Sequence, residues 1–339
     1  MDRIETGVCP VRVSMSGAML AAALAVFAML PIRAEAGPTV YIPLGKANEV
    51  IAVDAATSRI IARYPGVKNP HGLVATPDGE YLVAGSMDEV RTQGKDQGDS
   101  YLYLIHPEHG HVMSKIKVKG WSHHEAITPD GRYVISTHPM RAAVGVVDLR
   151  TDRVVHVIRT GPVPNYTLVT RDGKRAYVSN SGNGTISEIS LRSWKVTRTL
   201  KAGPVPEHMA FSPDERRIYV ANVRAGRVSV VDVRKGDVVK TFEVGPSLHG
   251  LGIGDDGRTL FVTSKKANKL VAIDTETGRQ RVLNLAPSPY HLNVIHGTGK
   301  LYVSSSKKSL IWVVRQKTLK LEGTIRLPAG EGHQMAIVR

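Results

Sequence analysis

The sequence has one cysteine, Cys9, in 339 residues. A single cysteine excludes an intramolecular disulfide, a c-type haem attachment motif and a zinc site built on several thiolates. Aromatic residues make up only 5% of the chain, and no GxSxG, HExxH or Walker-type motif occurs. A site for a soft metal would therefore have to be built from histidine and methionine.

Only one long apolar run is present, residues 17–30, and its 14 residues are too few to cross a bilayer comfortably. Arg3 and Arg12 precede the run, and Ala34-Glu35-Ala36 follows it as a small-residue cleavage motif. We therefore expect residues 1–36 to be a cleaved signal peptide. Residues 37–339 would then be a periplasmic or secreted protein with no integral membrane segment, which we expect to be a monomer.

What the sequence contains in abundance is a repeated unit of 42 residues. Each unit has a tight turn, in which proline presets φ, aspartate bonds the backbone and glycine accepts positive φ. A strand with a Tyr-Val pair follows, as at Tyr177-Val178, Tyr219-Val220 and Tyr302-Val303. The turns are Thr76-Pro77-Asp78-Gly79, Thr128-Pro129-Asp130-Gly131, Thr170-Arg171-Asp172-Gly173 and Ser212-Pro213-Asp214-Glu215.

The residues five before each turn fall at positions 71, 123, 165, 207, 249, 291 and 333, spaced by 52 once and by 42 five times. Four short strands in each unit predict an all-β, single seven-bladed β-propeller with four antiparallel strands per blade. The last unit supplies one strand, so its blade needs three more from Thr39–Leu44, Glu49–Asp54 and Arg59–Tyr64. Pairing these N-terminal strands with the C-terminal strand would close the ring and remove its free sheet edges.

On these turns and Tyr-Val strands, the repeat resembles the YVTN-type seven-bladed β-propeller family over residues 39–339. The resemblance implies the fold. It implies no single activity, because propellers host many unrelated functions.

Histidine is concentrated at one position of the repeat. The seven equivalent residues are His71, His123, Asn165, Glu207, His249, His291 and His333. His124 and His208 come directly after two of them. Because these residues open the strand that lines a propeller's central channel, we expect them at the channel mouth. Two residues further along, Glu125, Met209 and Met335 could add carboxylate and thioether groups.

A ring of imidazoles suits a borderline or soft cation, with copper first in affinity and zinc or iron behind it. The candidate metal ligands are His71, His123, His124, His208, His249, His291, His333 and Glu207. The alternative is structural, each imidazole donating a hydrogen bond to the backbone of a neighbouring blade.

The pair His123-His124 resembles the adjacent-histidine element of copper-binding propellers of the nitrous-oxide-reductase and thiocyanate-dehydrogenase kind, which implies copper held on channel histidines. The chain departs from that pattern, since it has no cupredoxin domain and Asn165 and Glu207 interrupt the ring. Propellers that bind haem d1 are also similar in their use of histidine and basic residues, but they have eight blades. A haem-d1-like tetrapyrrole is therefore the lesser expectation.

Basic residues exceed acidic ones by 45 to 30, and the formal net charge is +15. Eight of them fall in loops expected on the histidine face, where they could bind an anionic small molecule or cofactor. Nucleic acid is the less favoured partner, because the expected export would take the protein out of the compartment that contains nucleic acid. These residues are Lys46, Arg141, Arg224, Arg227, Lys265, Lys266, Lys307 and Lys308.

Three functions remain open. The first is a metal-binding protein with a periplasmic accessory or redox role and a redox partner. The second is a lyase or hydrolase, since similar propeller lyases and lactonases use a channel-mouth histidine as general base. His249, His291 or His333 would be that base, beside Glu207, Glu125 or Glu331. The third is a scaffold for a partner protein or a polyanion.

Overall fold

The structure is a computed structural model that describes residues 1, 7, 37–88 and 98–339. Residues Ala36–Arg339 form one compact unit. Residues 2–6 and 8–36, which hold nearly all of the expected signal peptide, lie outside the described residues, as do residues 89–97 between two strands of one blade. Among the described residues, no helix is long and apolar enough to cross a membrane.

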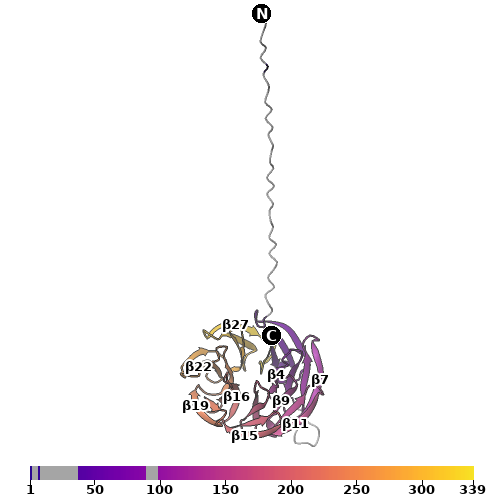
Figure 1. Ribbon diagram of the computed structural model, residues 1–339, viewed down its shortest axis with the longest axis vertical. Helices are drawn as coiled ribbons and strands as arrows, with labels where there is room; N and C mark the ends of the chain where they lie inside the picture. The colour runs from indigo at the N-terminus through magenta and orange to yellow at the C-terminus, as the bar shows by residue number, and fades with distance from the viewer. Residues whose placement is uncertain (2–6, 8–36, 89–97) are drawn as a thin grey trace. The chain divides into compact units, whose positions relative to one another are not determined.

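The seven-bladed propeller predicted from the repeat is confirmed. Across residues 37–88 and 98–339, seven four-stranded antiparallel sheets, the blades, are arranged in a ring (Figure 1). In each blade as given below, the first strand lies at the channel and the fourth lies at the outside. Blade 1 is β4 (Pro70–Ala75), β5 (Leu82–Ser86), β6 (Asp99–His106) and β7 (His111–Lys119). Blade 2 is β8 (Glu125–Ile127), β9 (Tyr133–His138), β10 (Ala143–Asp148) and β11 (Arg153–Arg159). Blade 3 is β12 (Pro164–Val169), β13 (Arg175–Asn180), β14 (Thr185–Ser190) and β15 (Lys195–Lys201).

The remaining blades follow the same plan. Blade 4 is β16 (Pro206–Phe211), β17 (Arg217–Asn222), β18 (Arg227–Asp232) and β19 (Asp237–Glu243). Blade 5 is β20 (Leu248–Ile253), β21 (Thr259–Ser264), β22 (Lys269–Asp274) and β23 (Gln280–Asn284). Blade 6 is β24 (Pro289–Ile295), β25 (Lys300–Ser305), β26 (Leu310–Arg315) and β27 (Lys320–Arg326). The helices of the described residues are two 3-10 turns, η1 (Gly45–Ala47) and η2 (Pro139–Arg141).

Blade 7 combines both ends of the described propeller, as the sequence predicts. It consists of β28 (Ala336–Val338), β1 (Thr39–Leu44), β2 (Glu49–Asp54) and β3 (Arg59–Pro65). The closing register pairs Tyr41 with Ala336, Val40 with Ile337 and Thr39 with Val338. A further bridge joins Leu44 to Gly332. This pairing covers the edge of β1 and gives the blade its fourth strand.

The channel strands of blades 1, 3, 4, 5 and 6 each begin with a β-bulge. In each of these strands the pairing register shifts between the first and the fourth residue, so the two residues between them turn out of the ladder. In blade 5 these residues are His249 and Gly250, and in blade 6 they are Tyr290 and His291. The bulges decide which side chains enter the channel.

The bulge of blade 6 corrects the alignment made from sequence spacing alone. Ser264 and Ser305, which pair with the first residues of β20 and β24, are 41 residues apart instead of 42. The residue structurally equivalent to His249 is therefore Tyr290. His291 occupies the next position, where blade 4 has His208.

We predict that the apolar contact between blades 6 and 7 is a main source of stability. Ile42 is fully buried in a cluster with Tyr302 and Ile311 of blade 6. Ile42→Ala should lower the free energy of unfolding by about 2–5 kcal/mol in urea denaturation. Ile61→Ala is the matched control in the same blade, because Ile61 is 57% exposed and should cost less than about 0.5 kcal/mol. Equal losses in both variants would contradict the prediction.

Candidate metal centre

Seven histidines and two tyrosines line the channel in two layers, which follow from the two residues that each bulge projects. We call outer tier the residues at the first bulge position or its equivalent, and inner tier those at the second. The outer tier is His71, His123, His249, Tyr290 and His333. The inner tier is His124, Tyr166, His208 and His291.

The outer-tier rings pack side by side around the channel. His71 has its ring centroid 4.2 Å from that of His333 and 4.5 Å from that of His123. Tyr290 stacks on His249 at 4.1 Å and lies 5.7 Å from His333. The tier is thus a continuous arc over blades 5, 6, 7, 1 and 2. It is interrupted at Asn165 and Glu207 of blades 3 and 4.

The inner-tier rings meet across the channel instead of along its wall. The His124 and His208 centroids are 4.9 Å apart, and His291 lies 5.0 Å from His208 and 5.7 Å from His124. These histidines are the most buried of the set, with exposures of 0%, 4% and 2%. Three blades that are far apart in the ring therefore contribute to one centre.

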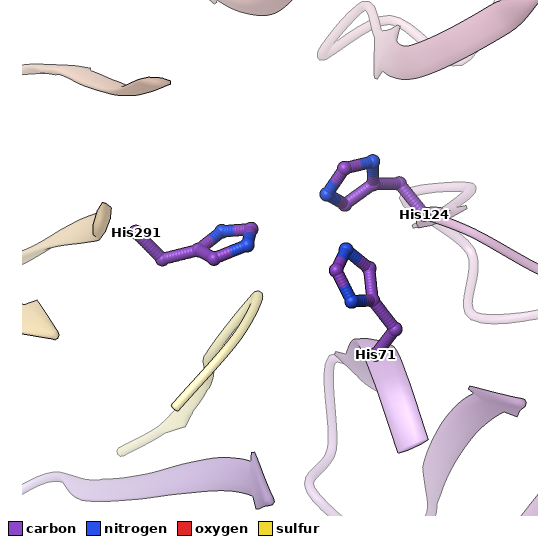
Figure 2. A group of neighbouring side chains, drawn as sticks. All are labelled: His71, His124 and His291. Atoms are coloured by element: carbon purple, nitrogen blue, oxygen red, sulfur yellow. The ribbon is translucent and has the colours of Figure 1, made fainter. Parts of the chain in front are cut away.

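Two trios of histidines have ligand nitrogens within 4.8 Å of one another: His71, His124 and His291, and His208, His249 and His291. Figure 2 shows the first trio, with the three rings directed toward a common point from β24, β4 and the segment before β8. His291 belongs to both trios. Its Nε2 lies 3.3 Å from Nε2 of His249, so one of the two nitrogens donates a hydrogen bond to the other.

Several of these nitrogens are buried without a hydrogen-bond partner among the described residues. They are Nε2 of His71, His124 and His208 and Nδ1 of His123 and His333. Leaving a buried polar atom unpaired costs roughly 1–3 kcal/mol each. A folded protein rarely gathers so many in one place without a ligand or another functional reason.

The structural alternative from the sequence, a hydrogen bond to the backbone of the neighbouring blade, holds for His124. His124 donates from Nδ1 to the backbone carbonyl of Asn165 at 2.9 Å. This bond fixes the ring and directs its Nε2 into the channel. A second ring, His138, lies outside both tiers and donates from Nδ1 to the carbonyl of Trp121 at 2.7 Å.

Burial keeps all seven imidazoles uncharged at neutral pH. It lowers the pKa of His123 to about 4 and that of His333 to about 3. Burial also lowers the pKa values of the other five rings well below 6.5, and repulsion between neighbouring rings adds to the effect for each of them. Neutral imidazole is the form that binds metals.

Two carboxylates and two lysines stand at the edge of the tiers. Glu207 Oε2 is 3.6 Å from His249 Nδ1, and Glu331 Oε1 is 4.0 Å from His333 Nε2. Lys46 Nζ pairs with Glu331 at 3.2 Å. Lys265 places its ammonium 4.6 Å above the Tyr290 ring, and partial burial lowers its pKa.

The other six basic residues predicted to bind an anion are distributed over the turns of this face. Arg227 lies 4.0 Å from Glu243, and Arg141 is in η2. Arg224, Lys266, Lys307 and Lys308 are exposed in the turns of blades 4, 5 and 6. The structure thus brings the predicted histidines and Glu207 together, but only Lys46 and Lys265 of the basic set are placed beside them.

The expected thioethers are absent from the cluster, so its ligands would be imidazoles. Met209 and Met335 pack into apolar clusters between blades. Glu125 is fully buried beside the channel, where burial raises its pKa to about 7. Its carboxylate accepts a hydrogen bond from Ser122 and occupies space that a side chain at Gly72 would fill.

Two features of the site were not predicted from the sequence. Tyr290 occupies the outer-tier position at which the 42-residue repeat placed His291. The 41-residue spacing of Ser264 and Ser305 is the feature of the sequence that could have indicated this shift. Gln334 bonds the backbone of Glu125 in both directions, accepting from its nitrogen at 3.1 Å and donating to its oxygen at 2.8 Å. No pattern in the repeat points to this bond between blades 7 and 2.

We predict an acid-sensitive fold in the metal-free protein. Burial lowers the pKa of His138 to about 4, so at pH 4.5 the unfolded chain binds a proton that the folded state does not. Stability is complete above about pH 6.5 and is lost as the pH falls toward 4. His138 should contribute about 2.5 kcal/mol to the loss between pH 7.5 and 4.5 in urea denaturation.

His138→Gln should reduce this pH dependence by that amount, whereas the exposed His156→Gln should leave it unchanged. An identical pH dependence in wild type and His138→Gln would contradict the assignment.

The family models match two parts of the chain. The model described as "SMP-30/Gluconolactonase/LRE-like region" matches residues 46–266. A second model, "Outer membrane protein assembly factor BamB", matches residues 224–321. None of the curated proteins matches the sequence.

Solved structures share the fold at low sequence identity. A putative 6-phosphogluconolactonase from Bacteroides fragilis has a TM-score of 0.75 at 17% identity, covering 91% of this chain and 100% of that one. The periplasmic gluconolactonase PpgL of Pseudomonas aeruginosa has a TM-score of 0.72 at 19% identity, covering 89% and 99%. Hydrazine synthase of Kuenenia stuttgartiensis has a TM-score of 0.67 at 18% identity, covering 77% and 87%. These structures support the propeller fold alone, but the first family model spans well over half of the sequence, so the chain belongs to the SMP-30/gluconolactonase/LRE-like family.

Proposed function

We propose that the two histidine tiers bind a transition metal, most favourably copper, and that the exported protein has a periplasmic accessory or redox role. The observation that carries this proposal is the pair of buried histidine trios with ligand nitrogens within 4.8 Å. They create two candidate positions for an ion, both of which use His291.

The spacing of His249 and His291 supports an ion between them. In a tetrahedral site with metal–nitrogen distances of about 2.0–2.1 Å, neighbouring ligand nitrogens are about 3.3–3.4 Å apart. The two Nε2 atoms are 3.3 Å apart. An ion between them would replace the proton of their hydrogen bond at almost the same separation.

The nitrogens that lack a hydrogen-bond partner favour the binding of a metal ion. Nε2 of His71, His124 and His208 is buried and unbonded, and every one of these residues belongs to a trio. Coordination would satisfy these atoms and offset the cost of having removed them from water.

The ligand set favours copper over the other candidates. Imidazole suits zinc, copper and iron, and copper(II) binds a given nitrogen site most tightly among the first-row divalent ions. Zinc and iron are the lesser candidates. A haem-d1-like tetrapyrrole fits less well, because stacked rings such as His71 on His123 at 4.5 Å leave no slot between them for a flat macrocycle.

The location of the protein is part of the proposal. Residues 1–36 would be removed as a signal peptide on export, leaving residues 37–339 as a monomeric periplasmic propeller. The periplasmic gluconolactonase among the similar folds is consistent with this location. A redox role would also require a periplasmic electron-transfer partner.

We predict that residues 37–339 bind copper and that His291→Ala removes most of this binding, since His291 serves both trios. Elemental analysis and isothermal titration with copper(II) at pH 7 measure the stoichiometry and the affinity. His71→Ala and His249→Ala should each affect one trio. His156→Ala, on the exposed strand β11, is the control and should bind as wild type does.

Circular dichroism of each metal-free variant establishes that it is folded before titration. A wild-type protein that takes up no copper, zinc or iron would overturn the metal site. Copper binding that survives in His291→Ala would place the ion elsewhere.

The family favours a second candidate, hydrolysis of a sugar lactone at the same channel mouth. The names of the matched family model and of two similar structures contain gluconolactonase. A neutral imidazole such as His249 or His333 could serve as the general base. The test is hydrolysis of glucono-lactone by metal-free and copper-loaded protein. Turnover by the metal-free form, abolished by His249→Ala or His333→Ala, would favour the hydrolase. No turnover in either form would exclude this lactone as a substrate.

A further inference from the structure

The two breaks in the outer tier, Asn165 and Glu207, share a feature that their sequence positions do not suggest. Each presents an oxygen to Nδ1 of a histidine. The backbone oxygen of Asn165 accepts from His124 Nδ1 at 2.9 Å, and Glu207 Oε2 lies 3.6 Å from His249 Nδ1. The breaks are therefore in contact with rings of the cluster.

The consequence for the two rings is the same. An imidazole that holds its proton on Nδ1 has its lone pair on Nε2, and only the lone pair binds a metal. The carbonyl of Asn165 can only accept, so it requires the proton on Nδ1 of His124. The carboxylate of Glu207 also only accepts when ionised. It therefore favours the same tautomer of His249, whose Nε2 is directed at His291.

We propose that Glu207 is a positioning residue for His249 and not a metal ligand, an inference that rests on the proposed metal site. Its carboxylate faces the edge of His249 that carries Nδ1, whereas the ion would be held by Nε2 on the other edge. Histidine ligands commonly give their second N–H to a carboxylate in this way, which orients the ring and raises its basicity.

The surroundings of His249 agree with this role. Tyr290 stacks on the ring at 4.1 Å, and the ammonium of Lys265 lies 4.6 Å from the centroid of the Tyr290 ring. The ring is thus held by stacking on one face and by the carboxylate at its edge. Glu207 is also absent from both trios found among the described residues.

The test compares Glu207→Ala and Glu207→Gln with wild type by copper(II) titration, with electron paramagnetic resonance of the loaded proteins. We expect the copper stoichiometry to be unchanged and the affinity to fall by about 10–100-fold in Glu207→Ala. Glu207→Gln keeps an acceptor oxygen and should lose less. Glu243→Gln, an exposed carboxylate at the end of β19 in the same blade, is the control and should match wild type.

A double-mutant cycle separates positioning from general destabilisation. In the His249→Ala background, Glu207→Ala should cause no further loss of affinity, because its effect acts through that ring. Loss of a whole equivalent of copper in Glu207→Ala alone would identify a ligand and overturn the inference. A copper affinity and a resonance spectrum of Glu207→Ala equal to those of wild type would also overturn the inference. A wild-type protein that binds no copper overturns the proposed metal site itself, before any variant is compared.

Discussion

The pairing of β28 with β1 is the constraint on which every distance in the channel depends. Three residue pairs join the two ends of the propeller and fix the circumference of a ring of seven blades. The same closure places the ring centroid of His333, in the last repeat, 4.2 Å from that of His71 in the first repeat. Without it, the outer tier would be an open row of residues along one edge of the blades.

Within the closed ring, the bulges convert a repeat into a site. An unbroken antiparallel strand sends successive side chains to opposite faces, so only every second residue could reach the channel. The bulge turns two neighbours out of the ladder, and the channel receives a second layer of rings. Because the layers come from adjacent residues, the outer rings pack around the wall while the inner rings meet at the axis. This arrangement lets blades 1, 2 and 6 supply one trio.

The sequence predicted the architecture well because its signals are local. Each tight turn is specified by three or four neighbouring residues, and the 42-residue period gives the number of blades and the three strands missing from the last repeat. The histidines that come together were also identified, since all of them lie at or next to one repeat position. What the sequence could not supply was the layer of each ring. A one-residue shortening before Ser305 moved His291 to the inner tier and put Tyr290 in its place.

Electrostatic roles were harder still to predict, because they depend on which edge of a ring a neighbour meets. Glu207 occupies a histidine position of the repeat, and spacing alone therefore made it a ligand candidate. In the structure its carboxylate lies 3.6 Å from Nδ1 of His249, at the edge of the ring opposite Nε2. The two lysines beside the tiers were hard to predict for a similar reason. Lys265 differs from the other lysines of this face by its partial burial over Tyr290, and the exposed Lys46 differs only by its ion pair with Glu331.

The wide separation of the cluster residues in the sequence has a consequence for the order of folding and metal binding. His71, His124 and His291 belong to blades 1, 2 and 6, and the last two residues are 167 positions apart in the sequence. Contacts of such long range form late, because a large loop must first be closed. Both trios include His291, so an ion could not be bound by a complete trio before blade 6 has been made. The trio of His71, His124 and His291 also requires blades 1 and 2 to have come together with blade 6, so its formation would report that most of the propeller had folded.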